Sequence, residues 1–225
     1  MHKKVTNTYF FSKFYDDKIK WSVSEIEETE SKKIIKTAKV LAGTNKSGFF
    51  GSLPVKLDFT NINSITGKSY VVAPRPNGKN YLMLIKNRGE IFMISENDHV
   101  FRVENMNFSQ LKDIKNCILD GILTESKHRG GNLRFVITDA ISYEGQQMKI
   151  PYEIRMQFIR NEIILPHNIV VPTQNPLLSE PEPFDIEQLD ICEVTGENLE
   201  KIIAEEYLKN KDFRPDGLFA RLESE

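Results

Sequence analysis

The stretch YVVAPRPNGKNYLMLI, residues 70–85, decides the fold because it has the outline of two strands joined by a tight turn. Asn77 and Gly78 stand between the two apolar runs. Asn-Gly is a preferred pair for a two-residue hairpin turn, in which the central residues take positive φ. The pattern therefore predicts a β-hairpin with Arg75 and Lys79 flanking its turn.

More apolar runs follow this stretch at short intervals. EIFMISEN and HVFRVENM are bounded by Asn-Arg-Gly and Glu-Asn-Asp, which is typical of an antiparallel meander. NCILDGILTES and NLRFVITDAISYEG come next, joined by the basic, glycine-rich residues 127–131. We expect strands throughout this block and one exposed cationic turn at Lys127-His128-Arg129.

Helical patterns lie on either side of the strand block. Residues 22–43 have apolar side chains at helical spacing, with a capping box formed by Ser24 and Glu27 and a stop at Gly43. A second helix should begin at Pro151 and run to residue 164, and a third should cover residues 196–210. Because helices and antiparallel strands are interleaved, without βαβ alternation, the fold class is α+β.

Length and composition predict one large globular domain. The chain has 225 residues, of which 40% are hydrophobic and 28% charged. We expect residues 1–47 to form an arm and helix packed on a domain of residues 48–225. The net charge of −2 gives no overall attraction to nucleic acid or membrane, so any nucleic-acid contact must use a local basic patch.

No cofactor, metal site or membrane span is expected. Cys117 and Cys192 are far apart and lack metal-ligand spacing, which favours buried thiols in a reducing compartment. The four histidines are scattered. No run approaches the roughly 20 apolar residues of a membrane span, so we expect a nuclear or cytoplasmic protein.

Five pieces, in order, resemble motifs of the nucleotidyltransferase domain of eukaryotic mRNA guanylyltransferases, the capping enzymes, from about residue 49 onward. RPNGKNY stands at the family's Lys-x-Asp-Gly-x-Arg motif and CILDGILT at its Asp-Gly-Glu motif. RFVITDAISYEGQ is similar to the Asp-plus-aromatic motif, IRMQFIRNEIILP to the helix after it, and RPDGLF to the last motif. The resemblance implies an antiparallel-sheet-rich nucleotidyltransferase fold like that of capping enzymes and DNA ligases.

The departures from the family pattern point away from catalysis. The family's lysine bonds covalently to GMP, but here the position holds Arg75, and a guanidinium is effectively never deprotonated in a protein. Asn77, Asn80 and Ile122 replace the family's aspartate, arginine and glutamate. The sequence stops just after RPDGLF, so we expect no OB-fold lid. A pseudoenzyme is the predicted outcome.

The cap-binding snurportins, which also resemble guanylyltransferases without the lysine, fit these losses better. Their Pro-x-Gly-Lys turn is matched by residues 76–79, and Tyr143 stands where their cap-stacking tryptophan lies. Residues 1–47 contain no arginine-rich segment like the one that these adaptors use for import. The resemblance therefore implies a pocket for a 7-methyl- or trimethylguanosine cap at an RNA 5′ end, or for a guanine nucleotide, but not a transport role.

Within that pocket, Tyr143 would stack on the cationic methylated base. Asp120 and Asp139 would accept hydrogen bonds from its edge. Arg75 and Lys79 would contact phosphate. The alternatives are a core-packed ring for Tyr143, strand-end or turn-capping roles for the two aspartates, and a solvated surface pair for the two cations.

Three further residues complete the predicted binding set. Asn77 lies in the turn and Asp216 in RPDGLF, and each has a simple turn role as its alternative. Arg102 points either toward the pocket or out of the sheet.

Two other functions stay open. One is active guanylyl transfer by a displaced lysine, Lys79 being nearest. The other is a scaffold that binds protein partners through its acidic helices or residues 172–183. A protein partner from nuclear import or a ribonucleoprotein particle is also compatible with cap binding.

Overall fold

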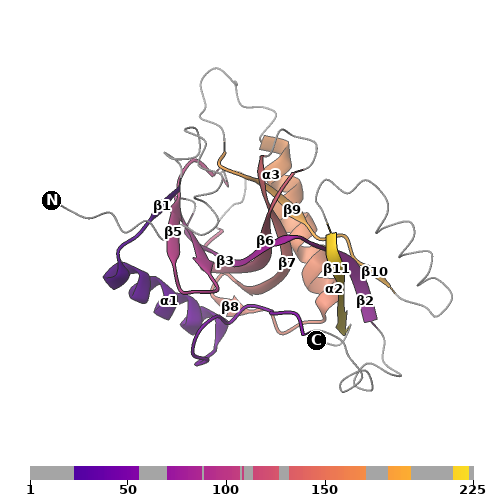
Figure 1. The fold of residues 1–225 in the computed structure, drawn as a ribbon, viewed down its shortest axis with the longest axis horizontal. Coiled ribbons are helices and arrows are strands. Elements are labelled where there is room, and N and C mark those ends of the chain that lie inside the picture. The colour runs from indigo at the N-terminus through magenta and orange to yellow at the C-terminus, as the bar shows by residue number, and fades with distance from the viewer. Residues whose placement is uncertain are drawn as a thin grey trace.

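The computed structural model describes residues 23–55, 70–87, 89–106, 108, 114–126, 132–170, 182–193 and 215–222. Two β-sheets and the helices packed on them make up this part of the chain (Figure 1). The larger sheet has the order β1-β5-β4-β3-β6-β7-β8, with β9 beside β7, and the smaller has the order β10-β2-β11. The elements are β1 (Val23–Glu25), α1 (Glu28–Ala42), β2 (Tyr70–Pro76), β3 (Gly78–Asn87), β4 (Glu90–Ser95), β5 (Val100–Val103), β6 (Cys117–Glu125), β7 (Leu133–Tyr143), β8 (Gln146–Gln147), α2 (Tyr152–Phe158), the π-helix η3 (Ile159–Ile164), α3 (Leu165–Val170), β9 (Asp185–Gln188), β10 (Cys192–Glu193) and β11 (Pro215–Leu222).

The hairpin predicted at Asn77-Gly78 is wrong. β2 pairs with β10 and β11 in the smaller sheet, whereas β3 pairs with β4 and β6 in the larger one. Asn77 is a bend between the two sheets, and neither it nor Gly78 has positive φ. A Cβ at position 78 would overlap with the carbonyl oxygen of Leu123 on β6. The glycine is therefore needed for close approach of two strands, and long-range pairing overrides the local turn preference.

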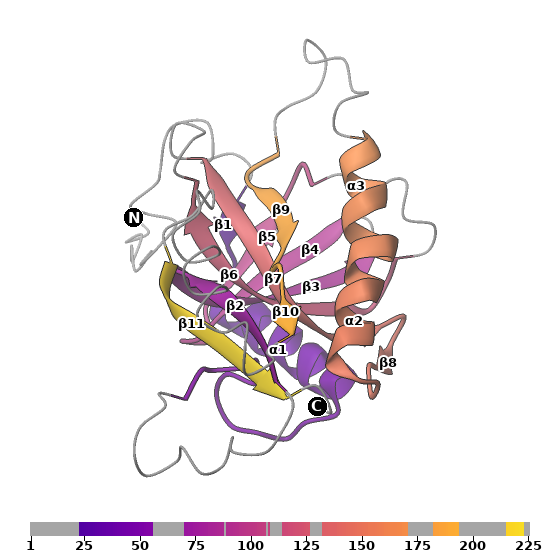
Figure 2. The ribbon, with the colours of Figure 1, turned by 90° about the vertical axis from the view of Figure 1, so that its right-hand side faces the viewer.

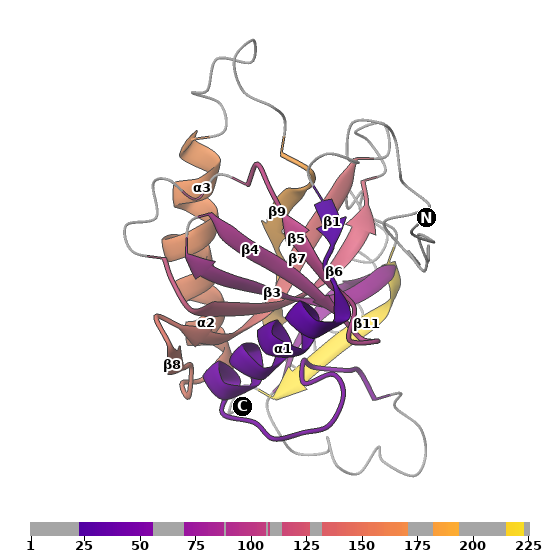
Figure 3. The ribbon, with the colours of Figure 1, turned by 90° about the vertical axis from the view of Figure 1, so that its left-hand side faces the viewer.

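Alternating side chains on the larger sheet build two cores. Leu82 and Leu84 face α1 and pack with its buried Ile34 and Ala38. The other face carries the larger core, which includes buried residues of α2 and η3 such as Met156. Figure 3 shows α1 crossing one face of the sheet, and Figure 2 shows α2 and α3 running end to end along the other.

Most predicted elements are confirmed, with changes at their ends. The meander is confirmed by β4 and β5, and the next two runs by β6 and β7. The first helix ends at Gly43, whose φ of 63° is left-handed, as predicted. Its capping box is wrong because Ser24 belongs to β1 and pairs with Arg102, and Glu27 at the N-cap makes no side-chain capping bond.

The helix that follows Pro151 is confirmed and continues past residue 164 to Val170, with a π-helical segment in its middle. Cys117 is buried as a free thiol, also as predicted. The predicted helix of residues 196–210 and the cationic turn of residues 127–131 lie outside the described residues. None of the helices in the described part is long and apolar enough to cross a membrane.

Gly78→Ala should lower the free energy of unfolding, because the new methyl group meets a backbone carbonyl that can move only with its strand. Overpacking of this kind costs about 1–3 kcal/mol. Gly217→Ala on β11 is the matched control, since a Cβ there has no atom within 4 Å. Urea unfolding of both variants measures the difference, and an equal loss in the two would contradict the close approach.

Candidate functional site

The site is built around two facing aspartates. Asp120 on β6 and Asp139 on β7 are register partners, and only 1% and 4% of their surfaces are exposed. The backbone N–H of Ser52 donates to Asp120 Oδ2 over 2.6 Å. A Cβ on Gly51 would lie 2.8 Å from the other carboxylate oxygen, so a glycine lets the chain pass this closely over the acid.

Asp139 is neutralised by two arginines from distant parts of the chain. Arg155 on α2 donates from Nε to Oδ1 over 2.7 Å and from Nη2 to Oδ2 over 3.1 Å. Arg221 on β11 approaches Oδ2 with Nη2 at 2.7 Å. Both guanidinium groups also lie over the ring of Tyr152, at 5.5 and 4.6 Å from its centroid. The cluster connects β7, α2 and the smaller sheet.

Burial raises the pKa of Asp120 to about 7, and the negative charge of Asp139 adds to the effect. The hydrogen bond from Ser52 and the charge of Arg221 act in the opposite direction. Asp120 therefore exchanges its proton near neutral pH and can either donate or accept a hydrogen bond.

A cavity of about 600 Å³ opens beside Asp139, and we call it the Asp139 cavity. Five of its lining residues matter for chemistry: the cations Lys46, Lys149, Arg155 and Arg221, and the aromatic Phe50. Arg221 Nη1 is buried without a hydrogen-bond partner. Four cations face one carboxylate, so the cavity favours an anionic ligand that brings an acceptor to this nitrogen.

The structure brings only part of the predicted set together. Asp120 and Asp139 meet as register partners, and Asp139 lines the cavity. Arg75 pairs with Gly217 across β2 and β11, Asn77 is exposed at the bend, and Lys79 is exposed at the start of β3. None of these three lines the Asp139 cavity, and their contacts to phosphate stay predictions.

Tyr143 and Arg102 are not among the residues that line the cavity either. The Tyr143 ring meets Phe158 edge-on, with 4.6 Å between centroids, and packs against the larger core. Arg102 is ion-paired with Glu30 of α1 at 3.1 Å. Asp216 belongs to β11, and its side chain is outside the described part. Their binding roles stay predictions.

The cavity cations and Phe50 were missed by sequence reasoning. Arg155 carried one usable signal, since it stands among Tyr152, Met156 and Ile159 on the buried stripe of its helix. A charged residue at such a position needs a buried partner. Within the described ranges, no three His, Cys, Asp or Glu side chains gather closely enough to hold a metal ion.

Comparisons with known proteins agree with this architecture. The family model described as mRNA capping enzyme, catalytic domain, matches residues 19–223. The mRNA-capping enzyme of Danio rerio is 35% identical over 128 residues, which are 54% of this chain and 21% of that protein. The mRNA-capping enzyme of Mus musculus is 33% identical over 154 residues, which are 63% of this chain and 26% of that protein. The chain therefore spans about a quarter of the length of these relatives.

A solved structure titled Pmar-Lig_PreS3 shares the fold, with a TM-score of 0.51 and 13% sequence identity. The likeness covers 87% of this chain and 47% of that one. It confirms the predicted α+β nucleotidyltransferase fold.

Arg155→Ala should destabilise the protein strongly, because it removes the bidentate partner of the buried Asp139. Breaking a buried pair costs roughly 3 kcal/mol or more in the free energy of unfolding. Arg102→Ala, which breaks an ion pair with more exposed partners, is the control and should cost about 1 kcal/mol or less. Urea unfolding compares them, and similar losses would show that Asp139 does not depend on Arg155.

The raised pKa of Asp120 predicts a pH-dependent stability. The native state binds this proton more tightly than the unfolded state, where the pKa is near its ordinary 3.8. The resulting stabilisation is complete below about pH 4, falls as the pH rises and is gone above about pH 7. Unfolding of the natural protein and of Asp120→Asn, measured across this range, should show a difference that declines by a few kcal/mol. Parallel pH profiles would refute the shift.

Proposed function

The chain belongs to the family of mRNA capping enzyme catalytic domains, and from this premise we propose that it binds a guanine cap at an RNA 5′ end, or a guanine nucleotide, without forming a covalent bond. The observation that carries the proposal is the Asp139 cavity, in which four cations and one aromatic ring surround a space of about 600 Å³. Ligand pockets commonly have volumes of about 300–1,000 Å³.

The charges in the cavity favour the phosphate bridge of a cap. Asp139 is already paired with both arginines, so the charge left for a ligand comes mainly from Lys46 and Lys149. Arg221 adds its unpartnered Nη1. Charge-assisted hydrogen bonds from these groups to phosphate oxygens would hold the ligand and weaken as salt rises.

An aromatic ring near the base would complete recognition. Phe50 lines the cavity, whereas Tyr143, the ring predicted from sequence, packs edge-on against Phe158. A methylated guanine is cationic and stacks well on an electron-rich face. Phe50 and Tyr143 are therefore alternative candidates for the ring that stacks on the base, and mutating each in turn distinguishes them.

Two features support binding without catalysis. Arg75 occupies the position of the family's lysine nucleophile, and its guanidinium cannot become a neutral attacking group. The lysines that could replace it, Lys46, Lys79 and Lys149, are all exposed to solvent. Lysine nucleophiles are usually activated by an apolar pocket or by an adjacent cation. Lys79 is the nearest lysine to Arg75 in sequence, and the two cavity lysines share their lining with Arg155 and Arg221, so all three define the active-enzyme alternative.

Titration of the protein with GTP, a 7-methylguanosine cap and a trimethylguanosine cap tests the proposal. At least one guanine ligand should bind, and Lys149→Ala should weaken it about three- to ten-fold through the loss of one phosphate contact. The exposed α1 residue Lys36 serves as the control, and Lys36→Ala should change nothing.

Phe50→Ala and Tyr143→Ala, measured in the same titration, identify the stacking ring. The variant that lacks it should lose about 1–3 kcal/mol of binding free energy. If none of the three guanine ligands binds the natural protein, cap binding is wrong and the protein-scaffold alternative takes its place.

A further inference from the structure

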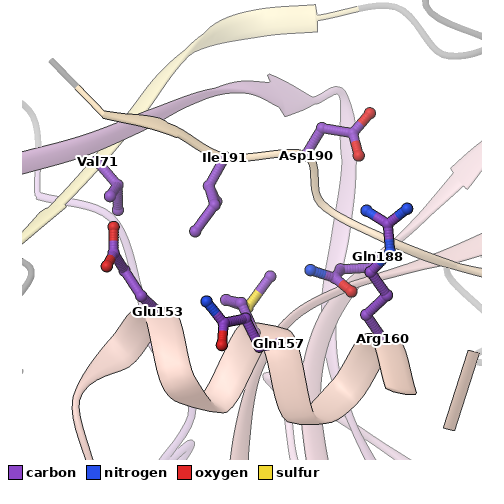
Figure 4. Close-up of a pocket in the computed structure, with 8 residues that line it drawn as sticks. Val71, Glu153, Gln157, Arg160, Gln188, Asp190 and Ile191 are labelled. Carbon is purple, nitrogen blue, oxygen red and sulfur yellow. The ribbon is translucent and has the colours of Figure 1, made fainter. Parts of the chain in front are cut away.

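A second cavity, of about 470 Å³, lies between α2 and the chain segment that follows β9 (Figure 4). We call it the Gln188 cavity. Val71 of β2 lines it, while Arg221, the register partner of Val71 on β11, lines the Asp139 cavity. On α2 the neighbours Arg155 and Met156 also face different cavities. Because register partners point to the same face of a sheet, both cavities lie on one face of the smaller sheet, and α2 contributes residues to each of them.

The most informative group in this cavity is the side-chain amide of Gln188. Its residue ends β9, opposite Ile137 of β7, and its Oε1 atom is buried without a hydrogen-bond partner. A buried acceptor without a donor lowers stability, so it favours a ligand that supplies an N–H or O–H group. Gln157 of α2 lines the same cavity, and Figure 4 shows its amide and that of Gln188 on the helix side.

The remaining walls form an apolar slot. Val71 and Ile191 project into the cavity from the strand side, as Figure 4 shows, and Met156 lines it from α2. Val71 and Met156 are buried parts of the larger core. Two apolar surfaces with amides beside them suit a flat heterocycle whose faces are apolar and whose edge is polar.

We propose that the Gln188 cavity binds an adenine base. A glutamine amide matches adenine with two hydrogen bonds, because its oxygen accepts from the exocyclic amine while its nitrogen donates to a ring nitrogen. The amine would supply the donor that Gln188 Oε1 lacks. Uracil offers the same donor and acceptor pair through N3–H and O4, but its single ring covers less of the apolar slot, so it should stack more weakly than adenine.

The charged residues that line the cavity limit how many phosphate groups the ligand can have. Arg160 is its only cation among the described lining residues, and Glu153 and Asp190 are carboxylates. A single phosphate can meet Arg160, whereas a polyphosphate would be repelled by the two acids. Arg160 lies in the π-helical segment, and such segments are frequent at functional sites. A free ligand is therefore a nucleoside or a nucleoside monophosphate, and the phosphate bridge of a capped end would have to lie in the Asp139 cavity.

The adenine could come from a free nucleoside or from the nucleotide next to a guanine cap. The first source is independent of the proposed function, and the second rests on it, with the cap guanine in the Asp139 cavity. Comparing the dinucleotides GpppA and GpppU separates them. GpppA binds more tightly only if one capped end reaches both cavities, and equal affinities assign the site to free adenosine.

Calorimetric titration with adenosine, AMP, ATP and uridine tests the proposal directly. Adenosine should bind at least about ten-fold more tightly than uridine, and AMP more tightly than ATP. Gln188→Met keeps the size of the side chain but removes the amide, and it should weaken adenosine at least ten-fold. Gln146→Met, at an exposed position on β8, is the control and should change nothing. Equal affinity for adenosine and uridine, or no binding of adenosine, would overturn the assignment.

An NMR measurement on the natural protein keeps the test valid if Gln188→Met fails to fold. In protein labelled at the methionine methyl groups, adenosine should shift the Met156 signal through the ring current of the base and leave Met148, which lines the Asp139 cavity, unchanged. Guanine ligands should do the reverse. An adenosine-induced shift at Met148 alone would place the base in the other cavity and refute the proposal, whatever the guanine ligands do.

Discussion

The structure depends most on the placement of one buried carboxylate, Asp139, between the guanidinium groups of Arg155 and Arg221. A buried charge is tolerated only with partners and hydrogen bonds in good geometry, so three elements must meet at this point. These are β7 of the larger sheet, α2, and β11 of the smaller sheet. The smaller sheet is thereby held against α2, and residues of both line each of the two cavities.

The same arrangement determines what the site can do. Because the arginines are paired with Asp139, the proposed ligand would be bound by exposed lysines and by single donor atoms, which suits reversible contacts to phosphate. Asp120 adds sensitivity to pH, since burial, with a further contribution from the charge of Asp139, raises its pKa. Under the proposed function, a family domain with Arg75 in place of the motif's lysine would hold a nucleotide without the usual group that attacks it.

The sequence pattern within a short segment was sufficient to predict elements that are stabilised by local interactions or that have a strong pattern of apolar residues. It identified the strands around Asp120 and Asp139, the helix stop at Gly43 and, through five ordered motifs, the family. It failed at Asn77-Gly78, where the turn preference lost to pairing of β2 with the distant β11, and at Ser24, which pairs with β5 instead of capping a helix. The three-residue charge cluster and the unpartnered Gln188 amide depend on contacts between remote segments, for which a single sequence gives no distances.

The central claim is that this domain holds guanine ligands without bonding to them. Intact-protein mass spectrometry after incubation with GTP and a divalent metal, followed by denaturation, tests that claim most directly. The account predicts the unmodified mass under conditions in which calorimetry detects bound guanine ligand. A species heavier by one GMP, acid-labile as a phosphorus–nitrogen bond is and mapped to Lys46, Lys79 or Lys149, would contradict it.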